Sequence, residues 1–199
     1  MNEKRFLGTV FGLGLSEGAV SVSKVAERTG CDLRETRSTA DRLVSGGFVK
    51  RIGTGISLTK EGRNAIKVVF IGGGFEIIHS GHIHTIDRAK SRGDVLVVVV
   101  ARDSTIRMRK GRDPVTGEQE RVGLLSSLRQ VDAAILGAEG DIYQTLERVG
   151  PDVVALGYDQ HHSEPEIVRQ AAKRGMRLEV VRLDSPHPTI KTSKLLRET

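Results

Sequence analysis

The sequence predicts an α/β protein in which a parallel sheet with helices on both faces follows a small helical domain that ends in a β-hairpin. Two observations support this prediction. From residue 67 onward, short apolar runs rich in β-branched residues alternate with amphipathic stretches, a pattern typical of parallel sheets. Before residue 67, apolar residues recur at helical spacing and helix-capping residues precede them. We therefore expect two domains, residues 1–66 and residues 67–199.

Composition narrows the class of protein. The chain has 199 residues, of which 38% are hydrophobic and 28% charged, as in an ordinary globular protein. No apolar run approaches the roughly 20 residues that a membrane helix needs, so we expect no membrane partner. The single cysteine, Cys31, cannot form an internal disulfide, and a cytoplasmic location is expected. The net charge of +6 suits an anionic partner.

The first domain contains recognisable helix signals. Ser21 and Ser23 are candidate caps of one helix, which Gly30 closes, and Asp32 can cap the next, which the pair Gly46-Gly47 ends. An alternating stretch then turns at residues 53–55, which predicts a hairpin.

Helix, short turn, helix and hairpin together resemble a winged helix-turn-helix domain. Residues 1–66 carry 11 Lys and Arg and 7 Asp and Glu, a net charge of +4, whereas the other residues, with 20 and 18, carry +2. A basic excess in this half fits a surface that contacts phosphate. The resemblance implies DNA binding, and a homodimer if two half-sites are read. The alternative is a domain retained for packing or dimerisation. The candidate DNA-binding residues are Arg34, Arg37, Arg42, Lys50 and Arg51.

The second domain begins with the strand KVVFIGG, and a cluster of glycines and histidines follows it. Ligands of parallel sheets bind at the carboxyl ends of strands, so this cluster lies where a ligand is expected. Glycines let backbone N–H groups approach an anion, and a helix that begins near His79 or Ser80 would direct its positive end there. The dinucleotide fingerprint and the Walker loop are both absent. A zinc site at the histidines is disfavoured because the single cysteine is remote; unliganded surface histidines are the simpler alternative.

Four segments, in order, carry a resemblance. GGFEIIHSGHIHTIDRAK resembles the Gly-Thr-Phe-Asp and His-x-Gly-His signature of the cytidylyltransferase-like nucleotidyltransferases. VVVARDSTIRMRKGRDPVTGEQER resembles the strand and basic loop of the FMN adenylyltransferases, or archaeal FAD synthetases, of that family. ALGYDQ and TIKTSKLL resemble its later segments. The chain departs from the pattern at Gly74, where the family has Thr, and at Glu76, where it has Asp.

The resemblance implies a Rossmann-like fold and an enzyme that transfers a nucleotide to a phosphorylated acceptor with release of pyrophosphate. His79 and His82 would contact the triphosphate, and His82 would help to neutralise the developing charge. Arg109 and Lys110 would reach phosphates of the acceptor or nucleotide, Lys110 as part of the catalytic set. A solvated basic loop is the alternative for these two. The implied nucleotide-binding residues are Gly73, Gly74, Phe75, His79, His82, Arg121, Gly157, Tyr158, Asp159, Thr192 and Ser193.

Substrates and cofactor follow from the same resemblance. The leading reading is transfer of AMP from ATP to FMN, which gives FAD. The alternatives are a CTP-dependent enzyme that acts on glycerol-3-phosphate or a similar acceptor, and a DNA-binding regulator that senses a nucleotide or flavin. Mg²⁺ would be held mainly through the triphosphate. For Arg121 an ion pair with Glu118 on a helix surface is the alternative. The pair His161-His162 could line the acceptor pocket, but an exposed loop is favoured for it.

Overall fold

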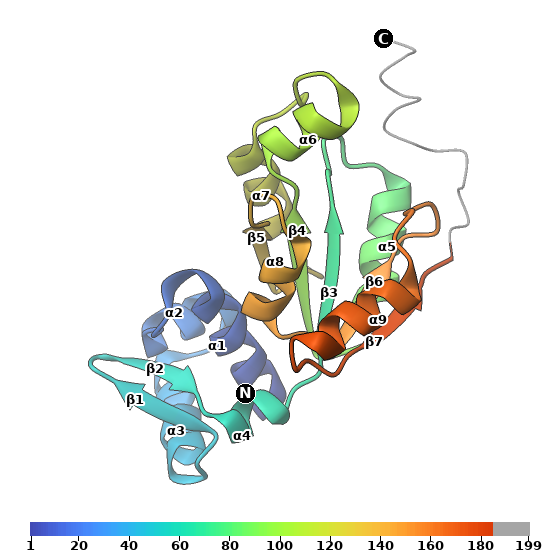
Figure 1. Cartoon of the computed structure of the whole chain (residues 1–199). Coiled ribbons are helices and arrows are strands. Elements are labelled where there is room, and N and C mark those ends of the chain that lie inside the picture. Colours follow the sequence, from blue (N-terminus) through green and yellow to red (C-terminus); the bar gives the residue numbers. More distant parts are fainter. Residues whose placement is uncertain (185–199) are drawn as a thin grey trace. The chain divides into compact units, whose positions relative to one another are not determined.

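A computed structural model describes residues 1–184 of the chain. Contacts divide the chain into two compact units, Met1–Lys67 and Val68–Thr199. No helix among the described residues is long and apolar enough to span a bilayer. The first unit comprises α1 (Glu3–Glu17), α2 (Val22–Thr29), α3 (Leu33–Ser45), β1 (Val49–Ile52), β2 (Gly55–Leu58) and α4 (Lys60–Asn64) (Figure 1).

Side-chain caps set the helix boundaries of the first unit. The Ser21 side chain accepts a hydrogen bond from the N–H of Lys24, and Asp32 accepts from the N–H groups of Arg34 and Glu35. Gly30 ends α2 in the left-handed conformation with φ 67°, which glycine adopts without a steric penalty. Strands β1 and β2 pair antiparallel, so the predicted hairpin is confirmed. Ser21 and Asp32 are confirmed as caps, whereas the other candidate, Ser23, lies inside α2. The winged-helix assignment stays a prediction.

The second unit is built on a five-stranded parallel sheet with the order β5-β4-β3-β6-β7. Helices lie on both faces of this sheet (Figure 1), as predicted. The elements are β3 (Val68–Gly73), α5 (Ser80–Lys90), β4 (Val95–Val100), α6 (Asp103–Lys110), α7 (Glu118–Ser126), β5 (Ala133–Leu136), α8 (Ile142–Val149), β6 (Val153–Leu156), α9 (Glu164–Lys173) and β7 (Glu179–Arg182).

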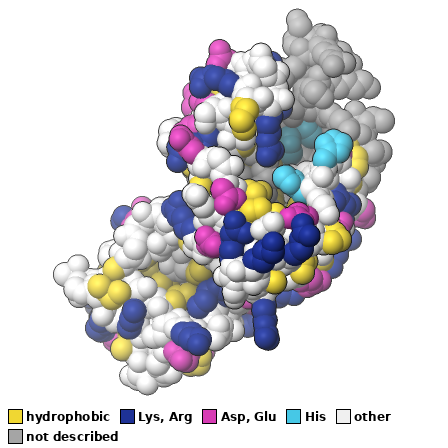
Figure 2. Space-filling view, in the orientation of Figure 1, with side chains coloured by type: hydrophobic (Ala, Val, Ile, Leu, Met, Phe, Trp, Pro, Cys, Tyr) yellow, Lys and Arg dark blue, Asp and Glu magenta, His cyan; other side chains and the backbone are white. Residues whose placement is uncertain are grey.

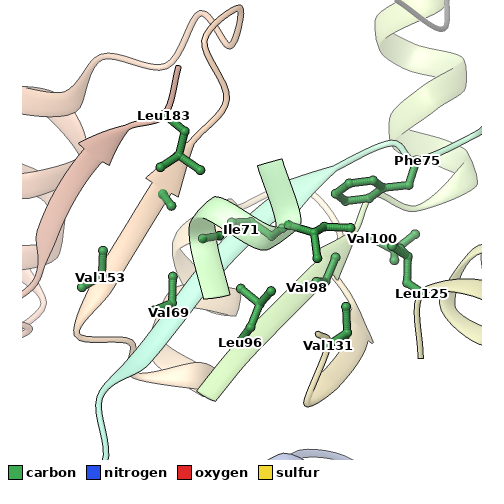
Figure 3. Close-up of a cluster of buried hydrophobic side chains, with 13 residues drawn as sticks. Val69, Ile71, Phe75, Leu96, Val98, Val100, Leu125, Val131, Val153 and Leu183 are labelled. Atoms are coloured by element: carbon green, nitrogen blue, oxygen red, sulfur yellow. The ribbon is translucent and has the colours of Figure 1, made fainter. Parts of the chain in front are cut away.

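Alternation along the central strands divides the sheet into two faces. Val69 and Ile71 of β3 pack with Leu96 and Val98 of β4 in a buried cluster that also includes α5 and α7 residues (Figure 3). Phe70, between them, lines a cavity that residues of α8 and α9 also line. The period of two in a strand separates these sets, so the α8/α9 face carries the cavity and the α5/α7 face the main core.

One predicted element is wrong. The segment after β4, expected as a basic loop, forms helix α6 over Asp103–Lys110. Asp103 lies in the first turn, where a negative charge favours the helix, and Gly111 closes the helix with φ 65°. The basic side chains therefore lie on a helix and on the short segment after it.

Candidate active site

Residues 72–74 at the end of β3, the glycine turn, lie at the centre of the site. A Cβ atom at Gly73 would lie 2.9 Å from the ring of Phe75, which is closer than such atoms approach. Phe75 has a positive φ of 51°, uncommon for a residue with a side chain, and its ring is buried in the core. The turn therefore folds back on itself, with Phe75 as its anchor and Gly73 as the position that leaves room for it.

Helix α5 begins beside this turn and brings the two histidines together. His79 is the N-cap residue and makes no side-chain capping hydrogen bond, so the start predicted at residue 79 or 80 is confirmed. The rings of His79 and His82 lie with their centroids 3.9 Å apart, and the ring of Phe75 lies 5.2 Å from that of His82. Histidine side chains gather on one face of the second unit in Figure 2.

The surroundings of both imidazoles favour their neutral form. Burial, followed by the proximity of His79, lowers the pKa of His82 to about 4. Burial also lowers the pKa of His79, and the nearby carboxylate of Asp159 partly offsets this effect. The Nδ1 atoms of both histidines are buried and have no hydrogen-bond partner among residues 1–184. Unpaired buried polar atoms are costly, so the pair is suited to bind a ligand that supplies hydrogen-bond partners.

A buried carboxylate attaches the basic segment to the turn. The Glu76 side chain, which has no exposed surface, pairs with Lys110 and lies 2.7 Å from Nη1 of Arg112. It also accepts a hydrogen bond of 3.2 Å from the N–H of Val115. Burial alone would raise the pKa of Glu76, but the hydrogen bonds from Arg112 and Lys110 lower it to about 2. Lys110, predicted to contact phosphate, thus lies beside the turn in an ion pair.

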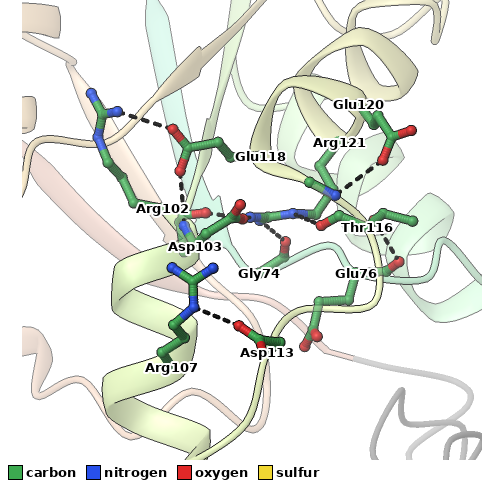
Figure 4. A network of polar contacts seen from close by, with 12 residues as sticks. Gly74, Glu76, Arg102, Asp103, Arg107, Asp113, Thr116, Glu118, Glu120 and Arg121 are labelled. Carbon is green, nitrogen blue, oxygen red and sulfur yellow. Dashed lines mark hydrogen bonds and ion pairs between the residues drawn. The ribbon is translucent and has the colours of Figure 1, made fainter.

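Arg121 lies deeper than the sequence suggested. Its side chain is only 1% exposed, and its guanidinium donates to backbone carbonyls and to Asp103 (Figure 4). The alternative of a surface ion pair between Arg121 and Glu118 is wrong, because Glu118 instead accepts hydrogen bonds from Arg102 and from the N–H of Asp103. Arg121 is therefore in place to hold the backbone around the turn.

A cavity of about 210 Å³ opens on the α8/α9 face at the carboxyl ends of β3, β4 and β6. Its walls are mostly apolar, with Phe70, Val99 and Leu156 from the strands and Tyr143 from α8. Gly73 and Gly74 also line it. The glycine turn therefore borders both the cavity and the start of α5, where the histidine pair lies.

Charged groups lie around this cavity. Arg109 lines it, and the Arg109 side chain makes no hydrogen bond or ion pair with another described residue. Burial, and then the charge of Arg109, lowers the pKa of His162, which also lines the cavity. The favoured interpretation of an exposed loop holds for His161, which is exposed, but not for His162, which is half-buried at the cavity. Arg182 donates hydrogen bonds to the carbonyls of Gly157 and His162.

The other predicted residues have different positions. Gly157 directly follows β6, and its N–H donates to the side chain of Gln160 over 3.1 Å. The carboxylate of Asp159 is close enough to His79 to raise the pKa of His79. Tyr158, the residue before Asp159, is half-buried. Thr192 and Ser193 lie outside the described residues. The described residues contain no group of three or more His, Cys, Asp or Glu that could hold a metal ion.

The model of the cytidylyltransferase-like family matches residues 70–198. The chain belongs to this family. Among curated relatives, the FAD synthase of Thermoplasma volcanium is 44% identical over 126 residues, 63% of this chain and 88% of the relative. The FAD synthase of Thermococcus onnurineus is 40% identical over 143 residues, 70% of this chain and 95% of the relative.

Solved structures of similar proteins agree with the family fold. The crystal structure of a protein described as the lipopolysaccharide core biosynthesis protein of Thermoplasma volcanium is 45% identical, with a TM-score of 0.58 over 60% of this chain and 98% of that one. Pantoate-beta-alanine ligase from Francisella tularensis, at 19% identity and a TM-score of 0.51 over 72% of this chain and 68% of that one, shares the fold.

The sequence analysis did not identify several residues that the structure places at this site. Arg112, Tyr143, Gln160 and Arg102 were not singled out, although Gln160 stands in the segment ALGYDQ. For Arg102 and Gln160 the available signal was a position shortly after a strand, which marks the ligand edge of a parallel sheet. Arg112 follows helix α6 and had only the basic character of its segment as a signal. Tyr143 had no such signal, because it reaches the cavity from helix α8.

Proposed function

We propose that this nucleotidyltransferase is an FMN adenylyltransferase, which transfers AMP from ATP to FMN and releases pyrophosphate. The observation that carries the proposal is the 40–44% identity to FAD synthases along 88–95% of their length. Fold alone does not fix a substrate, but both of these relatives carry the same named activity, FAD synthase. A phosphate oxygen of FMN would attack the α-phosphorus, and the bond from that phosphorus to the bridging oxygen of pyrophosphate would break.

The geometry supports a division of the site between two substrates. The triphosphate would lie over the glycine turn and the start of α5, with His79 and His82 as ligands of its oxygens. Burial favours the neutral form of both imidazoles before binding, and each neutral imidazole can donate one hydrogen bond. A bound triphosphate would raise their pKa values, since a nearby negative charge favours the protonated form. His82 would then stabilise the charge that develops as pyrophosphate leaves.

The cavity would take the acceptor. Its volume of about 210 Å³ is below the roughly 300–1,000 Å³ of pockets that enclose a whole ligand, so it would hold only part of the acceptor. Apolar walls suit a flat ring system, whereas glycerol-3-phosphate offers little apolar surface to them. Arg109, whose side chain makes no hydrogen bond or ion pair with another described residue, would bind the acceptor phosphate. These observations favour FMN over the glycerol-3-phosphate alternative.

The nucleoside would lie near the end of β6. Gly157, Tyr158 and Asp159 follow this strand, and Asp159 acts on His79 through its charge. Asp159 could accept hydrogen bonds from ribose hydroxyls. Mg²⁺ would arrive with ATP as part of the substrate, because its preferred oxygen ligands come from the triphosphate. Thr192 and Ser193 remain proposed ligands of the β- and γ-phosphates.

The test is a set of four reactions with Mg²⁺, in which ATP or CTP is combined with FMN or glycerol-3-phosphate. The expected result is pyrophosphate release with ATP and FMN alone, together with FAD on a chromatogram. Release only with CTP would replace the substrates but keep the reaction. No release in any mixture would refute the proposed activity for these acceptors and favour a ligand-sensing role.

The first unit supports a second function, DNA binding. Helix α3 follows α2 after a short turn, and Arg34 and Arg37 on it are exposed. Two other candidates are engaged, since Arg42 pairs with Glu3 and Arg51 with Asp41. We propose that Arg34, Arg37 and Lys50 contribute most to phosphate contact. A homodimer that reads two half-sites and a cytoplasmic location remain proposals, to be tested by light scattering and cell fractionation.

A further inference from the structure

The carbonyl oxygens of the glycine turn are all engaged by donors from elsewhere in the second unit. Gly72 accepts a hydrogen bond of 2.7 Å from Nε2 of Gln160. Gly73 accepts one of 2.9 Å from the N–H of Ala101. Gly74 accepts one of 2.6 Å from Nη1 of Arg121. Three successive carbonyls are thus held by three separate segments, which fixes the peptide planes of the turn.

The backbone N–H groups that follow, unlike these carbonyls, are not engaged in hydrogen bonds with described residues. None of the backbone N–H groups of residues 74–79 donates a hydrogen bond to a described residue. Phe75 within this stretch has the left-handed φ of 51°. Successive N–H groups around a left-handed residue form concave sites for anions. An anion site requires that the partially negative carbonyl oxygens be directed elsewhere, and the three hydrogen bonds meet this requirement.

Arg121 binds the glycine turn from the buried side. Beyond Gly74, its guanidinium donates to the carbonyls of Ala101 at 2.8 Å and Thr116 at 3.0 Å, and it lies 2.5 Å from the carboxylate of Asp103 (Figure 4). A side chain 1% exposed with these partners has no free surface for a nucleotide. Its effect on a ligand must pass through the backbone that it holds.

The Gln160 side chain links the ends of two neighbouring strands. Its amide oxygen accepts from the N–H of Gly157 and its amide nitrogen donates to Gly72, so one side chain joins the ends of β6 and β3. The carbonyl of Gln160 itself accepts from Arg182 at 2.8 Å. The carboxamide supplies both the donor and the acceptor in one group.

We propose that Gln160 and Arg121 are positioning residues for the triphosphate: they take the carbonyls of Gly72 and Gly74 and so leave the turn with its N–H groups available to the anion. The identity of the anion rests on the proposed function, whereas the anion site itself does not. Neither residue is a general acid or base in this scheme.

The test uses the full chain and inorganic tripolyphosphate, which carries the anion without base, ribose or acceptor. The variants are Gln160→Met, which keeps the size but removes both hydrogen bonds, and Arg121→Lys, which keeps the charge but cannot reach all four acceptors. Gln144→Met on exposed α8 surface is the matched control. Binding is measured by calorimetry at a temperature where circular dichroism shows every protein tested to be folded.

The expected result is binding about three- to ten-fold weaker for Gln160→Met and for Arg121→Lys, with Gln144→Met like wild type. This range corresponds to the net contribution of a single hydrogen bond to the turn that the anion meets. A role in folding alone would lower the melting temperature and leave the tripolyphosphate affinity of the folded protein unchanged.

Wild-type affinity in both folded variants would overturn the inference, as would an absence of tripolyphosphate binding by the wild type. If Arg121→Lys does not fold, Gln160→Met decides by itself, since Gln160 is only half-buried. A wild type that binds tripolyphosphate and loses affinity in the variants but makes no FAD would refute the proposed function and support the positioning role.

Discussion

The carboxylate of Glu76 lies 2.7 Å from the guanidinium of Arg112 and has no exposed surface, whereas the Arg112 side chain is 38% exposed. The buried acid therefore holds a partly exposed base beside the glycine turn. This arrangement places positive charge from the segment after α6 near the proposed phosphate site, and it makes the geometry of that charge depend on a single carboxylate.

Replacing Glu76 by Gln should lower the free energy of unfolding by about 1–3 kcal/mol, because donors of Lys110, Arg112 and Val115 lose a charged acceptor. The loss should stay below the roughly 3–5 kcal/mol of a fully buried ion pair, since both cations reach solvent. Urea unfolding at pH 7 measures it. Exposed Glu139→Gln is the control, and Glu76→Asp should lie between wild type and Glu76→Gln. Equal stability of Glu76→Gln and wild type would contradict the buried contacts.

His82 should make stability depend on pH. Its pKa is about 4 in the folded chain against 6.5 as a reference, so between these values the unfolded chain binds more protons. Stability is therefore lost as the pH falls from about 6.5 to 4. Thermal melts across this window should show a shallower slope for His82→Asn than for wild type or for exposed His161→Asn. Parallel slopes for all three proteins would show that the His82 pKa is not lowered.

His82→Asn should also separate turnover from binding. An amide can still donate a hydrogen bond but cannot become cationic as charge develops. We expect kcat for FAD formation to fall about 10²–10³-fold, with the Kd for ATP raised less than about ten-fold. Steady-state kinetics and calorimetry check this, with His161→Asn as control. A variant that turns over like wild type would remove His82 from the proposed mechanism.

Adjacent glycines of the turn should respond differently to a methyl group. A Cβ at Gly73 would meet the Phe75 ring at 2.9 Å, whereas one at Gly74 would meet only Ile106 at 3.8 Å. Gly73→Ala should therefore destabilise the protein by about 1–3 kcal/mol and weaken ATP binding. Gly74→Ala should stay within about 0.5 kcal/mol of wild type. Thermal unfolding and ATP titration of the pair test this, and equal effects would contradict the described packing.

Arg34 and Arg37 should govern DNA affinity if the first unit binds DNA. The double change to Ala should weaken binding of a random-sequence duplex and lower the slope of log affinity against log salt by about 2. Fluorescence anisotropy between low and physiological salt measures both. A double change of exposed Arg129 and Arg177 to Ala removes the same charge from the second unit. Equal effects of the two pairs would indicate nonspecific attraction to a basic protein.

Local signals explain why much of the fold could be predicted. Ser21 and Asp32 cap their helices because each offers an oxygen to N–H groups one turn away. The all-apolar run of β4 requires burial on both faces, and all six residues are buried. The start of α5 at Ser80 followed from the glycine cluster before it. Helix α6 was missed because short helices depend on tertiary contacts more than on propensity.

The sequence by itself determined the class of fold and the place of the site, because periodicity, caps and glycine positions act over a few residues. It also brought the residues of the glycine turn and the two histidines together, since they lie within a dozen positions. Only the tertiary structure decided the roles of Glu76, Arg121 and Gln160, each of which bonds to a residue 34 to 88 positions away. Burial and pairing of such groups depend on which distant segments the sheet brings to one edge, and no local pattern records that.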